Sequence, residues 1–411
     1  MSIYLHTDLK HPEIPLGIYI HFPYCNKRCP YCDFTLTTKA IDHQAYLHAV
    51  LKELTLHYIQ WIDHNRSRRL HSIYLGGGTP GLWDIEAVRQ LMIWMREHFE
   101  GVDTAEVTIE ANPAEITLAQ AQAWRQMGIN RLSLGTQSFD DKNLHYLGRT
   151  HTAQQARHAV TWARMAGFER INLDLIHGMV GQGVHEACQD LLYTLELEPE
   201  HIALYQLSIE KRTSFGARAS RGEQLLVPEQ RLVEIYQALD EQLQEAGLPL
   251  YEISNAAKPN EFSRHNMLYW TLGQYWGVGV GAHGLVHNGM QGRRWQNIRS
   301  IRNYLEYLSS QSVDQVTSNL AQYDHNLSQV VCEESEPLSD HSLWEESIMV
   351  GLRLRKGLVI TDKLRDRYAI AFDKQIKQGF IEEVEGHWRA SAKGRMLLDH
   401  ITYQILLDDS V

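Results

Sequence analysis

Three of the five cysteines in this 411-residue chain, Cys25, Cys29 and Cys32, lie within eight residues of one another. Soft thiolates in a C-x3-C-x2-C spacing suit an iron–sulfur cluster better than a hard cation. A zinc site would usually add a second Cys pair, and the chain has none, so zinc would need a histidine from elsewhere. Cys188 and Cys332 stand alone, and we expect them to be small buried hydrophobic residues.

Polar or glycine-rich residues also follow a series of short β-rich runs. The carboxyl ends of parallel strands meet at one edge of a sheet, so side chains placed there are expected to share one site. The runs are Ile18–Phe22, Ile73–Leu75, Val107–Glu110, Leu132–Gly135, Ile171–Ile176 and Ile202–Leu207. They lead in turn to the cysteine loop, Gly76–Pro80, Glu110, Gln137, Asp174 and Ser208.

Amphipathic segments separate these runs, which predicts an α/β fold with parallel strands and right-handed crossovers. Six units are enough for an incomplete parallel (β/α)6 barrel. The predicted helices are Gln44–Ile62, Ile85–His98, Leu118–Met127, Ala153–Ala166 and Val184–Leu195.

The rest of the chain predicts a barrel extension, a linker and a small C-terminal domain. We divide it into a barrel core at 1–215, an extension at 216–308 that begins near a helix over Pro228–Gly247, a polar linker at 309–340 and a domain at 341–411. The last part reads as three helices, a hairpin over Ile381–Ala390 and a final helix, which resembles a winged helix. Residues 340–411 carry 11 Lys and Arg against 12 Asp and Glu, so we expect no DNA binding.

The composition is that of an ordinary globular protein, with 44% hydrophobic and 22% charged residues. The net charge of −11 argues against a nucleic-acid partner, because phosphate binding needs a basic face. We find no apolar run long enough to span a membrane and no apolar signal core in Met1–Leu16. An odd number of cysteines does not describe a disulfide framework, so a cytoplasmic protein is expected.

The cysteine spacing, with an aromatic residue before Cys32, resembles the radical S-adenosylmethionine (SAM) superfamily, and Gly76–Pro80 resembles its glycine-rich motif. Within that superfamily the chain is similar to the oxygen-independent coproporphyrinogen III oxidase group along essentially its whole length. The further segments that carry this similarity are Tyr19–Cys32, Ile109–Pro113, Gly135–Phe139, Gly148–His151, Asn172–Gly178 and Tyr251–Asn255.

The resemblance implies a radical SAM barrel whose three cysteines hold a 4Fe-4S cluster, with SAM on the open iron. It also implies an electron donor such as flavodoxin or ferredoxin. By position, Tyr19, Gly77, Gly78, Thr79 and Glu110 would contact this SAM. Gln137, Arg149, Asp174 and Ser208 match further contacts, which in the oxidase include a second SAM.

Two departures from the oxidase pattern point to a different branch. The oxidases have a fourth cysteine where this chain has Phe34, and they have a longer segment before the cluster than the 24 residues that precede Cys25. These features and the string His265–Trp270 resemble the HemW branch with its HNxxYW motif, whose members are regarded as haem chaperones. Imidazole is a common axial ligand of haem iron, so His265 is a candidate haem ligand, the alternative being a core histidine.

Three functions therefore stay open, and we favour the first. The chain is a carrier that binds haem and passes it to acceptor proteins, or a coproporphyrinogen III oxidase that decarboxylates propionates, or a radical enzyme acting on another tetrapyrrole. Whether it is an enzyme is left undecided. We expect a monomer or homodimer that meets a membrane only through a haem acceptor.

Overall fold

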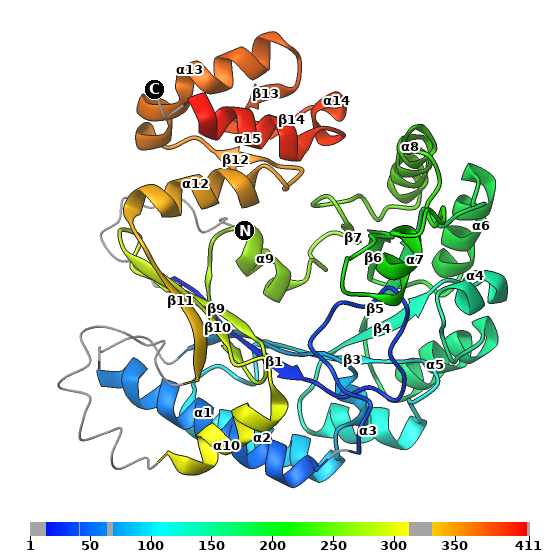
Figure 1. The fold of residues 1–411 in the computed structure, drawn as a ribbon, viewed down its shortest axis with the longest axis vertical. Helices are drawn as coiled ribbons and strands as arrows, with labels where there is room; N and C mark the ends of the chain where they lie inside the picture. Colours follow the sequence, from blue (N-terminus) through cyan, green and yellow to red (C-terminus); the bar gives the residue numbers. More distant parts are fainter. Residues whose placement is uncertain (1–13, 41, 64–68, 312–330, 409–411) are drawn as a thin grey trace.

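The computed structural model describes residues 14–40, 42–63, 69–311 and 331–408. Figure 1 shows one large curved sheet with helices along its outside and a smaller unit at one end. The large sheet has eleven strands in the order β11-β10-β9-β8-β1-β2-β3-β4-β5-β6-β7. The segment Met1–Leu16, predicted to lack a signal core, lies largely outside the described residues.

Six neighbouring strands of this sheet are the predicted parallel strands, which confirms the predicted α/β fold of parallel strands joined by helices. All pair in parallel register, and a further parallel strand, β8 (Gln274–Val278), lies on the outer side of β1. The six are β1 (Leu16–Phe22), β2 (Leu70–Gly77), β3 (Glu106–Ala111), β4 (Arg131–Gln137), β5 (Arg170–His177) and β6 (His201–Gln206).

The crossover helices match the sequence prediction within a few residues because their ends carry capping signals. Thr117 and Gln120 form a capping box at the start of α3, and Thr152 and Gln155 form another at α5. Two short helices, α4 (Asp141–Tyr146) and α7 (Ser214–Ala219), were not predicted. The long crossover helices are α1 (His43–Asp63), α2 (Ile85–His98), α3 (Leu118–Gln126), α5 (Ala153–Met165) and α6 (Val184–Leu195).

The barrel extension adds α8 (Glu229–Glu245), β7 (Asn255–Ala257) and α9 (Arg264–Trp270), followed by antiparallel strands at the other edge of the sheet. These are β9 (His283–His287), β10 (Gly292–Asn297) and β11 (Cys332–Leu338), with α10 (Ile301–Ser310) after β10. The linker predicted over 309–340 is therefore wrong at its end, where β11 pairs with β10. Because β11 is an edge strand with mostly exposed side chains, its composition is polar, like that of a linker. Residues 312–330 of that segment lie outside the described residues.

The C-terminal elements form a second unit with its own core, drawn orange to red at the top of Figure 1. Phe372 and Trp388 stack there with ring centroids 3.7 Å apart. The structure has two helices, not three, before the predicted hairpin, because a short strand replaces the middle one. The elements are α12 (Asp340–Gly351), β12 (Leu358–Val359), α13 (Asp362–Lys377), β13 (Ile381–Val384), β14 (His387–Ala390), α14 (Ala392–Arg395) and α15 (Leu398–Asp408). The exact domain boundaries stay a prediction.

Among the described helices, none combines the length and the apolar character that crossing a membrane would require.

Candidate functional site

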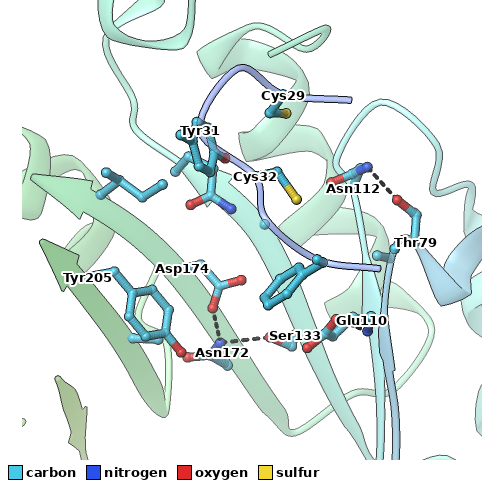
Figure 2. Close-up of a pocket in the computed structure, with 18 of the residues that line it drawn as sticks. Cys29, Tyr31, Cys32, Thr79, Glu110, Asn112, Ser133, Asn172, Asp174 and Tyr205 are labelled. Carbon is cyan, nitrogen blue, oxygen red and sulfur yellow. Dashed lines mark hydrogen bonds between the residues drawn. The ribbon is translucent and has the colours of Figure 1, made fainter. Parts of the chain in front are cut away.

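A cavity of about 610 Å³ opens at the carboxyl ends of the parallel strands, where the sequence predicted a shared site. Figure 2 shows its walls, with the cysteine loop above the ends of the strands. Most of the predicted site residues line this one cavity: Cys25, Cys29, Cys32, Gly77, Gly78, Thr79, Glu110, Gln137, Arg149, Asp174 and Ser208. Their convergence follows from the parallel pairing, since residues far apart in sequence come to the same sheet edge.

The cysteine loop brings three free thiols to the cavity wall. Cys25 Sγ lies 3.1 Å from Thr79 Oγ1, and Arg149 Nη1 donates to Cys29 Sγ at 3.5 Å. Burial raises the pKa of the Cys32 thiol. Figure 2 shows the sulfur atoms of Cys29 and Cys32 on the side of the loop that faces Asn112 and Thr79.

This donor set fits an iron–sulfur cluster better than a single ion. Across the described ranges, no three His, Cys, Asp or Glu side chains are arranged to hold one metal ion. Three thiols that line a common cavity instead suit a larger, sulfur-ligated group. Cys188 and Cys332 lie elsewhere and are half-buried, not fully buried as predicted.

The glycine-rich segment after β2 leaves no room for side chains. A Cβ on Gly78 would lie 2.4 Å from the carbonyl oxygen of Tyr24, which belongs to the backbone and cannot move aside cheaply. Gly77 has a φ of +115°, a conformation that L side chains rarely adopt. The backbone of this segment therefore packs directly against the cysteine loop.

Two carboxyl groups face the cavity from neighbouring parts of the sheet. Glu110 accepts hydrogen bonds from Tyr74 OH at 2.7 Å and from the Gly77 amide at 3.1 Å, and burial raises its pKa. Asp174 accepts from Asn172 Nδ2 at 2.7 Å; burial, and then the charge of Glu110, raise its pKa to about 7. These acceptors suit hydroxyl or ammonium groups of a ligand.

Gln137 stands at an irregular strand end. Its φ of 64° is unusual for a residue other than glycine, and the β4–β5 register shifts between Leu134 and Gln137. A Cβ on the adjacent Gly135 would lie 3.1 Å from Gln137 Nε2 and 3.3 Å from Arg149 Nη2. The strand thus bends where two polar side chains enter the cavity.

The model of the radical SAM superfamily matches residues 19–192. The heme chaperone HemW of Escherichia coli strain K12 is 32% identical over 94% of this chain and 97% of the relative. The HemW of Mycobacterium tuberculosis is 31% identical over 96% of each chain. This chain belongs to the HemW family.

A solved structure also shares the fold of this HemW-family chain over nearly its whole length. The coproporphyrinogen III oxidase HemN of Escherichia coli matches with a TM-score of 0.75 over 96% of this chain and 91% of that one. The identity is 23%, so the likeness shows the fold alone.

Two residues predicted to bind cofactors lie outside the cavity. His265 is 1% exposed; its Nδ1 lies 2.9 Å from Ser72 Oγ and its Nε2 2.9 Å from Tyr269 OH. In this conformation both ring nitrogens of His265 have hydrogen-bond partners and neither is free for an iron, so haem binding by His265 stays a prediction. Tyr19 does not line the cavity either, and its hydroxyl lies 3.0 Å from His21 Nδ1.

Three residues of the network were missed, although segments already quoted contain two of them, Asn112 and Asn172. Asn112 donates to Thr79 Oγ1 at 3.0 Å and accepts from Arg149 Nη2 at 2.5 Å, which ties two predicted residues together. Asn172 donates a hydrogen bond to Asp174, and His201 in turn forms a hydrogen bond with Asn172. The segments Ile109–Pro113 and Asn172–Gly178 contain Asn112 and Asn172, but the sequence did not show which of their side chains line the cavity.

A chain of hydrogen bonds leads from Asp174 to the C-terminal unit. Asn172 gives its amide N–H to Asp174, so its oxygen accepts from His201 Nδ1 at 2.6 Å. His201 Nε2 must then accept from Tyr251 OH at 2.9 Å, and burial keeps the pKa of this histidine well below its usual value. The Tyr251 carbonyl accepts from the Arg355 amide at 2.9 Å. The ring of His201 is thus neutral, with its proton on Nδ1.

Large apolar side chains face the same cavity. Phe34, two residues after Cys32, is 62% exposed, and Tyr205 on β6 is 42% exposed. Exposed aromatic faces in a cavity are suited to a planar apolar ligand. Leu36, Ile176 and Leu207 extend this apolar lining.

Proposed function

We propose that this chain is a haem chaperone of the radical SAM class, which binds a 4Fe-4S cluster, SAM and haem and passes haem to acceptor proteins. The observation that carries the proposal is the match, over almost the full length of both chains, to relatives named heme chaperone HemW. The site geometry supports it independently, because a thiol loop, polar strand ends and exposed aromatic residues share one cavity.

The polar part of the cavity is the proposed SAM site. Cys25, Cys29 and Cys32 would hold the cluster, which supplies an open iron and an electron. Glu110 and Asp174 offer acceptors, and Gly77 and Gly78 allow a close approach of the backbone. Thr79, Gln137, Ser208 and Arg149 complete this wall, and the guanidinium of Arg149 also donates to Cys29.

The apolar part of the cavity is the proposed haem site. Phe34 and Tyr205 present exposed rings there, and Phe34 supplies no fourth thiolate. We propose no iron ligand, because His21 also uses both ring nitrogens, with Tyr19 and with the Thr35 carbonyl. An electron donor of the flavodoxin or ferredoxin type, haem acceptors and a cytoplasmic location complete the proposal.

The test is an anaerobic assay of reconstituted protein with two ligands in parallel. Haem titrated into the protein should give a saturable Soret band at about one haem per chain. Coproporphyrinogen III with SAM and reductant should give no divinyl product. Cys29→Ala serves as the cluster-deficient control in both arms. Turnover of coproporphyrinogen III would refute the chaperone proposal and favour the oxidase, while failure to bind haem would refute both the carrier role and the haem site.

A further inference from the structure

A second cavity, of about 400 Å³, lies between α8 and the C-terminal unit. It shares no lining residue with the cavity described above. Arg355, Arg389 and Arg395 line it from the C-terminal unit, together with Glu382 on β13 and Asp240 on α8. Three guanidinium groups in one small space are unexpected in a chain with a net charge of −11.

The positive charges of this cavity are only partly compensated. Arg355 Nη2 donates to Asp240 Oδ2 at 2.5 Å, and Arg389 donates twice to Glu382 Oε2, at 2.9 and 3.0 Å. Among the described residues, no carboxylate forms an ion pair or hydrogen bond with Arg395, although the charge of Asp240 acts on it from a greater distance. Arg395 Nη1 donates a hydrogen bond to the Ala390 carbonyl at 3.3 Å. One positive charge is therefore left over.

The surroundings of Arg395 make this excess costly. Burial, and then the nearby charge of Arg355, lower the pKa of the Arg395 guanidinium; Tyr236 and Asp240 oppose this shift, and Arg389 adds to it. The Nε atoms of Arg355 and Arg395 are buried without a hydrogen-bond acceptor in the described structure. A buried donor without an acceptor destabilises the fold, so the site lacks one negatively charged acceptor group.

We propose that this cavity binds a small oxyanion, a phosphate or carboxylate group, between Arg395 and its neighbours Arg355 and Arg389. Planar guanidinium groups present paired N–H donors that match the oxygens of either group. All three arginines belong to the C-terminal unit, so that unit holds the anion, and only the folded chain presents the cavity that this unit forms with α8. Anion binding therefore stabilises the folded chain.

The experiment titrates inorganic phosphate, and separately succinate, into the full-length protein at constant ionic strength set with chloride. Isothermal calorimetry and the thermal unfolding midpoint are the readouts. We expect saturable binding of at least one anion and a midpoint that rises with its concentration. Arg395→Gln should weaken binding about tenfold or more, because a charge-assisted hydrogen bond is lost. Arg395→Lys keeps the charge and should retain part of the affinity.

Two further variants keep the result interpretable if Arg395→Gln fails to fold. Asp240→Asn removes the carboxylate that competes for Arg355 and should tighten anion binding. Arg302→Gln, on α10, removes an arginine whose side chain is 83% exposed and should change nothing. Saturation by phosphate alone identifies a phosphate site, and saturation by succinate alone identifies a carboxylate site. Midpoints equal to the chloride control with both anions, or equal affinities in wild type and Asp240→Asn, would overturn the proposal.

Discussion

Replacing Asp174 by asparagine removes a charge that the cavity disfavours. Burial, reinforced by Glu110, raises the pKa of Asp174 from 3.8 to about 7. One unit corresponds to about 1.4 kcal/mol, so the ionised carboxylate costs the fold up to about 4 kcal/mol. Because the side chain lines an open cavity where solvent screens its charge, we expect about 2–3 kcal/mol. Asparagine keeps an oxygen that accepts from Asn172 Nδ2.

The sign of the pH dependence follows from proton binding. Between pH about 4 and 7 the folded chain holds the Asp174 proton more tightly than the unfolded chain, so this contribution to stability falls as pH rises. Buried histidines act in the opposite direction, since burial lowers the pKa of His21, His151 and His177 to about 4. Both proteins share these histidines, so the difference between variant and wild type isolates Asp174.

Urea unfolding from pH 5 to 8, followed by tryptophan fluorescence, measures this difference. Asp174→Asn should exceed wild type by about 2–3 kcal/mol at pH 8 and by only about 1 kcal/mol at pH 5. Asp103→Asn, which removes an exposed carboxylate beside Arg96, controls for the loss of one charge. A difference that stays flat over this range, or that grows toward low pH, would refute the reasoning.

Substitutions at three further positions, Cys29, Glu110 and His265, test the remaining assignments, each read against the variants or measurements named with it. Cys29→Ala should abolish the brown chromophore after anaerobic reconstitution, whereas Cys188→Ala and Cys332→Ala should keep about four irons per chain; the reverse pattern would refute the cluster assignment. Glu110→Ala should weaken SAM binding in calorimetric titration without loss of iron, and an unchanged affinity would demote Glu110 to a structural residue. His265→Ala should lower the free energy of unfolding of the ligand-free protein by about 2–4 kcal/mol, because Ser72 and Tyr269 lose their partner, and should leave the haem Soret band in place. The exposed His158→Ala is its control, and a lost Soret band at unchanged stability would show His265 to be a ligand.

The residues of the site could be predicted from the sequence because each wall of the cavity comes from one short segment of the chain. A short β-rich run followed by a polar residue specifies both a buried strand and the edge where it ends, as at Val107–Glu110. Parallel pairing then brings Glu110 and Asp174 to the same edge without further information. The thiol spacing of the cysteine loop is likewise contained in one segment.

Features that depend on tertiary contacts could not be predicted in the same way. The strand Cys332–Leu338 has no apolar alternation, and only its pairing with β10 makes it a strand. The inward turn of Asn112 depends on Thr79 and Arg149, which are 33 and 37 residues away. The residue type alone does not indicate that an asparagine at this position makes these contacts.

The histidine of the HNxxYW motif shows how a residue suited to one chemistry can serve another. A histidine beside aromatic residues predicts a haem ligand as readily as a core residue, because the sequence does not show where its ring nitrogens point. In the structure the His265 amide donates to Glu106, its ring joins Ser72 to Tyr269, and Arg353 from the C-terminal unit lies 4.8 Å from the ring centre of Trp270. Asn266 of the same motif lines the cavity. The motif thus places Asn266 in the cavity wall, while His265 and Trp270 pack α9 between the sheet and the C-terminal unit. Replacing His265 should therefore lower the stability of the fold and leave the haem Soret band in place.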